Sequence, residues 1–431
     1  MGKKRTKGAQ KTSGRTAAVQ EPKPSRPRRP LSTGKKLLFS AICLIVFPAL
    51  AVLLAELTLR AAGYGFPASF FLERRINGEK VLVDNVKFGW RFFPPTISRR
   101  PHDFVIPVRK PEGTFRVFVF GESAAWGDPD PSFGMSRILQ TLLTDQFPNV
   151  RFEVVNAAMA AISSHVVYQI ARDAAEREPD AFIVYMGNNE VIGPFGPGTV
   201  FSGFSESIHF IRLAVWARGQ ALTQFILDMK TLLQGRHRQP QVWPGMQMFE
   251  EHKVRSDDPR LETMYRHLRR NLTDIIRAGK RAGAGVVVCN MAANFGGWGP
   301  HASLHRPGLD GEELKRWKEA FEAGRKAQEA RDWPQALARY EEAEKIDATY
   351  AELQFRMGKC HEALGRFDLA MEHYGRAIDE DCLRFRTDSR INEIIRETAA
   401  GEGTAFVDVR KHFVEVSPNG IPGMNLLDDH V

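Results

Sequence analysis

One stretch of the chain, from Leu37 to Ala55, contains no charged side chain: LLFSAICLIVFPALAVLLA. About 20 apolar residues in a helix cross the roughly 30 Å of hydrocarbon in a bilayer, and a single segment satisfies its backbone hydrogen bonds there only as a helix. The apolar region of a cleavable signal peptide is shorter, at about 7–15 residues. We therefore predict a transmembrane helix over residues 37–59, in preference to a core helix or a signal sequence, and a membrane as a partner.

The distribution of charge predicts how this helix is oriented. The net charge is +9, but residues 1–36 hold twelve Lys and Arg against one acid, Glu21, so this segment is +11 and the remainder is −2. Positive charge marks the cytoplasmic end of a membrane helix. We expect a single-pass protein with a disordered cytoplasmic tail at 1–36 and a periplasmic or otherwise extracytoplasmic domain after Arg60. The near-neutral remainder gives no support for a nucleic-acid partner.

Short apolar runs alternate with longer segments of helical spacing in the rest of the chain. The expected strands are 115–120, 152–157, 181–187, 284–291 and 405–409. The longer periodic segments between them are expected helices. This alternation predicts an α/β fold with a sheet flanked by helices on both faces. Residues 64–113 are rich in proline and are expected to be irregular.

Residues 312–382 interrupt this alternation with helical signals that repeat at a constant spacing. The matched pairs are Gly324 and Gly358, Trp333 and Phe367, Ala336 and Ala370, Tyr340 and Tyr374, Ala343 and Ala377, and Asp347 and Asp381. The period of about 34 residues, with small residues at helix contacts and aromatic residues between them, resembles the tetratricopeptide repeat (TPR). We expect a TPR-like helical insertion that packs on the α/β domain and binds a protein partner.

Ser123 follows the first of these strands in the stretch VFVFGESAAWG. The carboxyl ends of strands are where open α/β sheets place their ligands. Taken alone, GES after a strand favours a helix cap, because Ser is a common N-cap residue. The second strand ends in NAAMAAISS and the third in YMGNNE, and in a parallel sheet both ends would lie beside Ser123.

Together these three blocks resemble those of the SGNH (GDSL-type) hydrolase superfamily, whose fold is a flavodoxin-like parallel sheet flanked by helices. The resemblance implies that Ser123 is the catalytic nucleophile, with Glu122 in place of the usual Asp. It also implies an oxyanion hole formed by the backbone N–H groups of Ser123 and Ala161 and the side-chain amide of Asn189. Ala161 stands where the family usually has Gly. No metal and no organic cofactor is implied.

The last block of the family, D-x-x-H, is matched only in part by the stretch NLLDDHV. The position three residues after Asp429 lies one residue beyond Val431, and the only acids near His430 are one and two residues before it. Two interpretations stay open. In the one we favour, Asp429 is the triad acid, the chain is a fragment and its catalytic His follows Val431. In the other, His430 is the base in an altered motif. Neighbouring side chains in an extended segment point opposite ways, which argues against His430.

The order of the parts resembles bacterial membrane-anchored SGNH proteins with TPR repeats between the fourth strand and the last block. The implied parts are the tail 1–36, the membrane helix 37–59, the hydrolase domain 64–311 and 383–431, and the insertion 312–382. The resemblance implies a serine esterase that cleaves acyl esters of cell-envelope glycans or lipids. Two alternatives remain: a catalytically inactive SGNH-fold protein whose repeats bind a partner, or an O-acyltransferase with the same triad.

Overall fold

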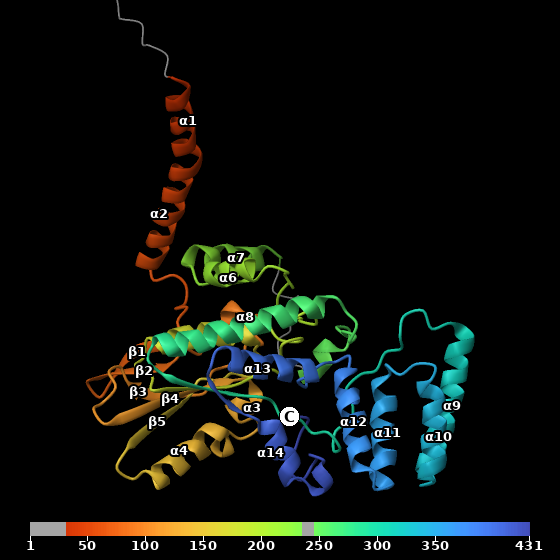
Figure 1. Cartoon of the computed structure of the whole chain (residues 1–431). Helices are drawn as coiled ribbons and strands as arrows, with labels where there is room; N and C mark the ends of the chain where they lie inside the picture. The colour runs from red at the N-terminus through yellow and green to blue at the C-terminus, as the bar shows by residue number, and fades with distance from the viewer. Residues whose placement is uncertain (1–31, 235–244) are drawn as a thin grey trace, which may run out of the picture. The chain divides into compact units, whose positions relative to one another are not determined.

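The computed structural model of the chain describes residues 32–234 and 245–431 (Figure 1). The predicted disorder of the basic tail falls mostly on residues 1–31, which lie outside the described residues. At residues 33–36 the prediction is wrong, because an α-helix begins at Thr33. The chain divides into two compact units, residues 1–58 and residues 59–431.

An apolar helix makes up the described part of the first unit. It consists of α1 (Thr33–Ala41), a π-helical turn (Ile42–Val46) and α2 (Phe47–Ala61), whose last residues belong to the second unit. Over its most apolar 18 residues the mean hydropathy is 2.8, and none of that window is buried within the protein. By length and composition this helix can cross a membrane.

A five-stranded sheet forms the centre of the second unit. Its strands are β4 (Thr114–Gly121), β5 (Arg151–Asn156), β6 (Ala181–Tyr185), β7 (Gly285–Cys289) and β8 (Ala405–Val407). The order is β5-β4-β6-β7-β8, and every neighbouring pair is parallel. The five predicted strands and the α/β class are thereby confirmed. The order also places the carboxyl ends of β4, β5 and β6 next to one another.

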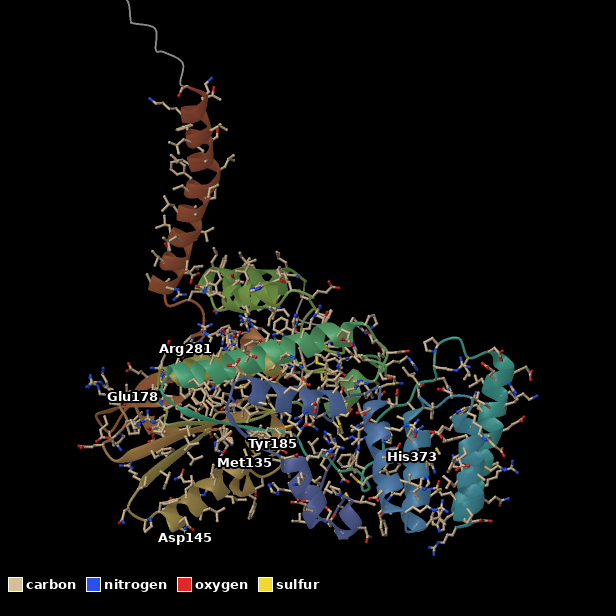
Figure 2. All side chains as sticks on the ribbon, viewed as in Figure 1. Met135, Asp145, Glu178, Tyr185, Arg281 and His373 are labelled. Atoms are coloured by element: carbon tan, nitrogen blue, oxygen red, sulfur yellow. The ribbon has the colours of Figure 1, made fainter. Side chains whose placement is uncertain are left out.

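Helices cover both faces of this sheet (Figure 1). On one side lie α5 (Ser164–Ala175), α8 (Arg260–Arg281) and α13 (Ser389–Gly401), and α8 packs against the other two. On the other side lie α4 (Met135–Gln146) and α14 (Val409–Val416). Apolar side chains from the strands and from α5, α8 and α13 fill the space between them and form one buried core (Figure 2).

A second, smaller sheet lies in the segment expected to be irregular. It is antiparallel and contains β1 (Phe71–Ile76), β2 (Glu79–Asp84) and β3 (Val105–Pro107). The prediction of irregular structure for residues 64–113 is therefore wrong at these strands. Asn77 and Gly78 form the turn between β1 and β2 with φ of 51° and 87°. Asn-Gly is the preferred sequence of a two-residue hairpin turn. The sequence therefore contained a local signal for this hairpin, in addition to the prolines that suggested irregular structure.

Four helices form the insertion between β7 and β8. They are α9 (Gly311–Glu329), α10 (Trp333–Glu344), α11 (Ala351–Ala363) and α12 (Phe367–Asp379), and each packs against the next (Figure 1). A Cβ added to Gly324 would lie 2.6 Å from the ring of Tyr340, and a Cβ on Gly358 would lie 2.6 Å from the ring of Tyr374. The same close contact thus recurs at the interval of the sequence repeat. The assignment of this insertion to the TPR family stays a prediction.

Two further helices, α6 (Ile208–Arg218) and α7 (Ala221–Gln234), lie between β6 and α8. They form part of the periodic sequence between the third and fourth expected strands, where helices were predicted. Short helical turns complete the described elements, at Phe88–Arg91, Pro131–Phe133, Gly245–Phe249 and Pro418–Gly420.

Candidate active site

Ser123 is the first residue of the short helix α3 (Ser123–Trp126), directly after β4. The N-cap of α3 is Glu122, so the interpretation of Ser123 as a helix cap is wrong. A Cβ on Gly121 would lie 2.1 Å from the backbone oxygen of Tyr185, the last residue of β6 (labelled in Figure 2), so glycine is needed where β4 meets β6. The Ser123 side chain is partly exposed, and its Oγ makes no hydrogen bond to another described residue. The hydroxyl is therefore available to a substrate.

The third block, which contains Asn188 and Asn189, is hydrogen-bonded directly to Glu122, the residue before Ser123. The backbone N–H groups of Asn188 and Asn189 donate to Glu122 Oε2 at 2.7 and 3.2 Å. The Asn189 side chain is 7% exposed, and its Nδ2 has no hydrogen-bond partner among the described residues. A buried donor left without a partner costs about 1–3 kcal/mol. An unpaired amide held near a candidate nucleophile is the arrangement that an oxyanion hole requires.

The second block reaches the same strand end through two hydrogen bonds. The N–H of Met159 donates to the backbone oxygen of Gly121 at 3.2 Å, and Asn156 Nδ2 donates to the backbone oxygen of Trp126 in α3 at 3.0 Å. In this loop Ala161 has a φ of 62°, in the left-handed region. That conformation costs an L-residue roughly 1–2 kcal/mol and suits Gly better. Ala161 therefore keeps the backbone that a Gly would adopt.

Two buried glutamates support these loops. Glu122 is fully buried, and burial raises the pKa of its carboxyl well above the usual range, with the charge of Glu190 adding to the effect. Burial also raises the pKa of Glu190 to about 7. Glu190 accepts hydrogen bonds from the N–H and the Oγ of Ser164, at 2.7 and 2.8 Å, and so ties the third block to the start of α5. The sequence analysis marked Glu122 as a replacement of the family's Asp, but it did not identify either glutamate as a support of the site.

The charged stretch after the insertion, which includes Arg386 and Thr387, also supports the site. The sequence analysis did not predict this role. Thr387 donates to Asn188 Oδ1 through its N–H at 3.1 Å and its Oγ1 at 2.6 Å. Arg386 is only 3% exposed and donates to the backbone oxygens of Asn294, Trp298 and Gly299. Charged stretches more often form solvated faces. The alternation of charged and uncharged residues gave no signal for burial.

Asp429 and His430 form a hydrogen-bonded pair in a bend. Asp429 Oδ1 lies 2.6 Å from His430 Nδ1, so the argument that their side chains must diverge is wrong. It assumed an extended segment, whereas the chain bends at Asp429. The His430 ring packs against those of Trp298, His301 and Phe385. Burial lowers the pKa of His430 although Asp429 opposes the shift, so its imidazole is neutral near pH 7. No hydrogen bond joins His430 to Ser123 within the described residues.

Two other histidines, His301 and His305, have the four-residue separation of some helical metal sites. Each instead contacts a buried aspartate. His301 Nδ1 lies 3.3 Å from Asp381 Oδ2, and His305 Nδ1 lies 2.9 Å from Asp347 Oδ2. These two aspartates are a matched pair of the sequence repeat, so the histidines connect the insertion to the segment before it. Across residues 32–234 and 245–431, no group of three His, Cys, Asp or Glu is arranged to hold a metal ion.

Comparison with known proteins gives few constraints. No family model matches the chain, and no curated protein matches it. Similar solved structures include AlinE4, an SGNH-hydrolase family esterase (11% identity, 75% of this chain and 87% of that chain, TM-score 0.29). The acetyl xylan esterase AlAXEase has 11% identity, coverage of 69% and 79%, and a TM-score of 0.29. TesA has 16% identity and a TM-score of 0.24, and the match spans 42% of this chain but only 62% of TesA. TM-scores this low do not assign a function to this chain. The functional conclusion therefore rests on the geometry of the site.

Proposed function

We propose that the chain is a membrane-anchored serine esterase of the SGNH type. The observation that carries this proposal is the buried Asn189 Nδ2, which has no partner among the described residues and which Glu122 holds beside the strand end that presents Ser123. Asn188 Nδ2 is also unpaired among the described residues, but Thr387 binds the Asn188 side chain through its Oδ1. The Asn189 amide is the one that the family resemblance assigns to the oxyanion, and in the proposed site it is kept for a group that is present only when substrate is bound.

In the proposed reaction, Ser123 Oγ attacks the carbonyl carbon of an acyl ester while a histidine takes its proton. The carbonyl oxygen becomes negatively charged and accepts hydrogen bonds from the N–H groups of Ser123 and Ala161 and from Asn189 Nδ2. The histidine then gives the proton to the departing alcohol. Water attacks the acyl-enzyme in the second half of the reaction and releases the acid.

Asp429 is the proposed triad acid, since its carboxylate can orient an imidazole. Its partner is either His430, whose Nδ1 it contacts, or a different histidine. The variant His430→Ala separates these assignments. If His430 is the base, reaction of Ser123 with an ester-like probe falls by about 10³-fold or more. Unchanged reactivity in this variant removes His430 from the mechanism.

A fluorophosphonate probe, which labels activated serines covalently, tests the nucleophile. We expect labelling of the wild-type chain, complete loss in Ser123→Ala, and no change in Ser132→Ala, a matched change at an exposed serine. A wild-type protein of its full natural length that is folded by circular dichroism but is not labelled would contradict the esterase and favour an inactive, partner-binding protein. Product analysis with and without a sugar acceptor separates hydrolysis from O-acyl transfer.

The proposed location is the outer face of a membrane, where cell-envelope glycan or lipid esters would be the substrates. It is supported by the apolar helix from Thr33 to Ala61 and by the basic residues that precede it. We expect the chain to stay with membranes after alkaline carbonate extraction. Deletion of residues 37–55 should release it into the soluble fraction. Release of the full chain by carbonate would refute the anchor.

A further inference from the structure

Helix α6 carries apolar side chains on two opposite faces. Ile211 and Val215 are each 1% exposed and pack into the core. On the opposite face, Phe210, Leu213 and Trp216 are 62%, 58% and 62% exposed. Apolar side chains on the outward face of a helix indicate a second apolar surrounding, such as another protein or a membrane. Among the described residues, no other element covers the outer face of α6.

Helix α7 extends the same surface. It exposes six large apolar side chains in one short stretch: Phe225, Ile226, Leu227, Met229, Leu232 and Leu233. Leu227 lines a cavity beside α7; we call the other five, together with Phe210, Leu213 and Trp216, the hairpin face. Contiguous exposed apolar surface on a soluble domain marks a site of interaction with protein or membrane.

Covalent connection places this hairpin close to the end of the apolar helix. That helix ends at Ala61, and Tyr64, three residues on, donates from its hydroxyl to Asp228 of α7 at 2.5 Å. The N–H of Phe66 donates to Gln224 Oε1 of α7 at 2.8 Å. Three to five residues span at most about 10–18 Å. Tyr64 and Phe66, which bind α7, therefore lie within that distance of the end of the apolar helix.

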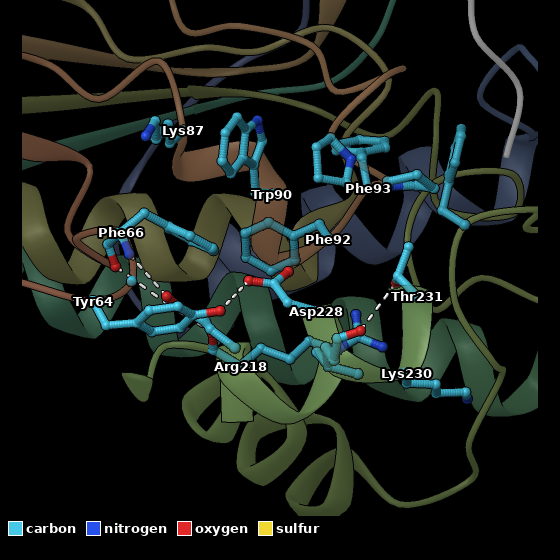
Figure 3. Close-up of a pocket in the computed structure, with 16 residues that line it drawn as sticks. Tyr64, Phe66, Lys87, Trp90, Phe92, Phe93, Arg218, Asp228, Lys230 and Thr231 are labelled. Carbon is cyan, nitrogen blue, oxygen red and sulfur yellow. Dashed lines mark hydrogen bonds between the residues drawn. The ribbon is translucent and has the colours of Figure 1, made fainter. Parts of the chain in front are cut away.

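A cavity of about 670 Å³ lies beside α7, and its lining favours a negatively charged surface (Figure 3). Trp90, Phe92 and Phe93 line one part of it, and α7 lines another; Ser123 is not among the lining residues. Its cations are Lys87, Arg218 and Lys230, against a single acid, Asp228, which accepts the Tyr64 hydrogen bond. Aromatic rings and long cationic side chains are the residues that gather at the headgroup level of membranes.

From these observations we propose that the hairpin face binds the surface of a bilayer that contains anionic phospholipids. Phe210, Leu213 and Trp216 enter the acyl boundary, and the cations of the neighbouring cavity meet the headgroups. This binding rests on the proposed membrane anchor, and it fixes the second unit against the membrane instead of leaving it on a free tether. An ester substrate in the bilayer would then be presented to a domain of constant orientation.

The test uses the full chain in vesicles of phosphatidylcholine and phosphatidylglycerol whose acyl chains carry bromine, which quenches nearby tryptophans. The chain has seven tryptophans, and none lies between Thr33 and Ala61, so the apolar helix contributes no signal. We expect quenching in the wild type and its loss, at least twofold, in Trp216→Phe. The matched change Trp333→Phe, on α10, should leave quenching unchanged. Equal quenching of the wild type and Trp216→Phe would overturn the proposal.

A second pair of variants tests the face itself. Leu213→Glu should reduce bromolipid quenching of Trp216 at least twofold and increase its quenching by aqueous iodide, whereas Leu142→Glu should do neither. Leu142, on α4, is 61% exposed, close to the 58% of Leu213, so the two changes differ mainly in place. Unchanged quenching in Leu213→Glu would contradict the proposal. So would protection of Trp216 from iodide in unbrominated vesicles that rises with protein density, which would indicate a second copy of the chain.

Carbonate extraction of the same vesicles reports on the anchor separately. A chain that resists carbonate but shows no quenching by bromolipid keeps its anchor and lacks the hairpin contact, which overturns this inference alone. A chain that carbonate releases lacks the anchor, which overturns both.

Discussion

The two halves of the proposed site are built in different ways. Around Ser123, buried hydrogen bonds join three strand ends, including those from Asn188 and Asn189 to Glu122. Asp429 and His430 instead form a local pair between neighbours, and the Asp429 side chain is 57% exposed. Buried hydrogen-bonded groups hold their geometry more strictly than exposed pairs. The nucleophile half is therefore organised in the absence of substrate.

Asn189→Ala should have the largest effect within the nucleophile half. Removal of one oxyanion donor typically costs about 10²–10³ in rate, or about 3–4 kcal/mol. We expect a loss of this size in kcat for a small ester such as p-nitrophenyl acetate, with KM changed much less, because the amide acts only when the oxyanion forms.

Asn149→Ala is the matched control, since Asn149 is exposed and lies near the amino end of β5, at the opposite end of the strand from the site. It should leave kcat unchanged. An Asn189→Ala variant that keeps wild-type kcat, or that loses affinity for substrate in place of rate, would place Asn189 outside the oxyanion hole and weaken the contrast between the halves.

Glu190→Gln should change how stability depends on pH. The pKa of Glu190 is raised to about 7 in the folded chain from a usual value of 4.5. The folded state therefore binds more protons than the unfolded state between these values, and stability falls as pH rises from about 4.5 to about 7. At about 1.4 kcal/mol per pKa unit, the loss is roughly 2–3 kcal/mol. Because glutamine cannot ionise, the variant should lose this part of the slope and be more stable than the wild type at pH 8.

Urea unfolding at pH 4.5 and pH 8 measures this difference. Some slope should remain in the variant, because Glu122 has a raised pKa of the same sign. Glu112→Gln, at an exposed position, should behave as the wild type does. If the stability of Glu190→Gln falls between the two pH values as much as that of the wild type, Glu190 is ionised in the fold and does not support the site as proposed.

Regular features of the fold could be predicted because each leaves a periodic signal in the sequence. The apolar runs of β4 and β6 and the repeat that pairs Gly324 with Gly358 are of this kind. Ser123 and Asn189 could be proposed because their blocks resemble those of a known superfamily and because parallel strand ends lie together. The support that Thr387 and Arg386 give to the site could not be predicted. Their partners lie far away along the chain, at Asn188 and Asn294, and no local pattern states which buried polar groups will meet.

The smallest of these effects is expected at Ala161. Variants there test whether the glycine-like backbone of the loop is needed to direct the Ala161 N–H toward the oxyanion. Relief of the left-handed conformation should favour Ala161→Gly by about 1–2 kcal/mol, and the greater freedom of Gly in the unfolded chain should cancel about 0.5–1 kcal/mol of this. We expect a net gain of about 0.5 kcal/mol in urea unfolding, with activity within twofold of the wild type. Ala161→Val should lose at least about 1 kcal/mol, because a β-branched residue is a strong outlier at a φ of 62°. It should also lose activity if the backbone of the loop changes so that the N–H of residue 161 no longer points to the oxyanion. A valine variant with full stability and full activity would show that the oxyanion is bound without this loop.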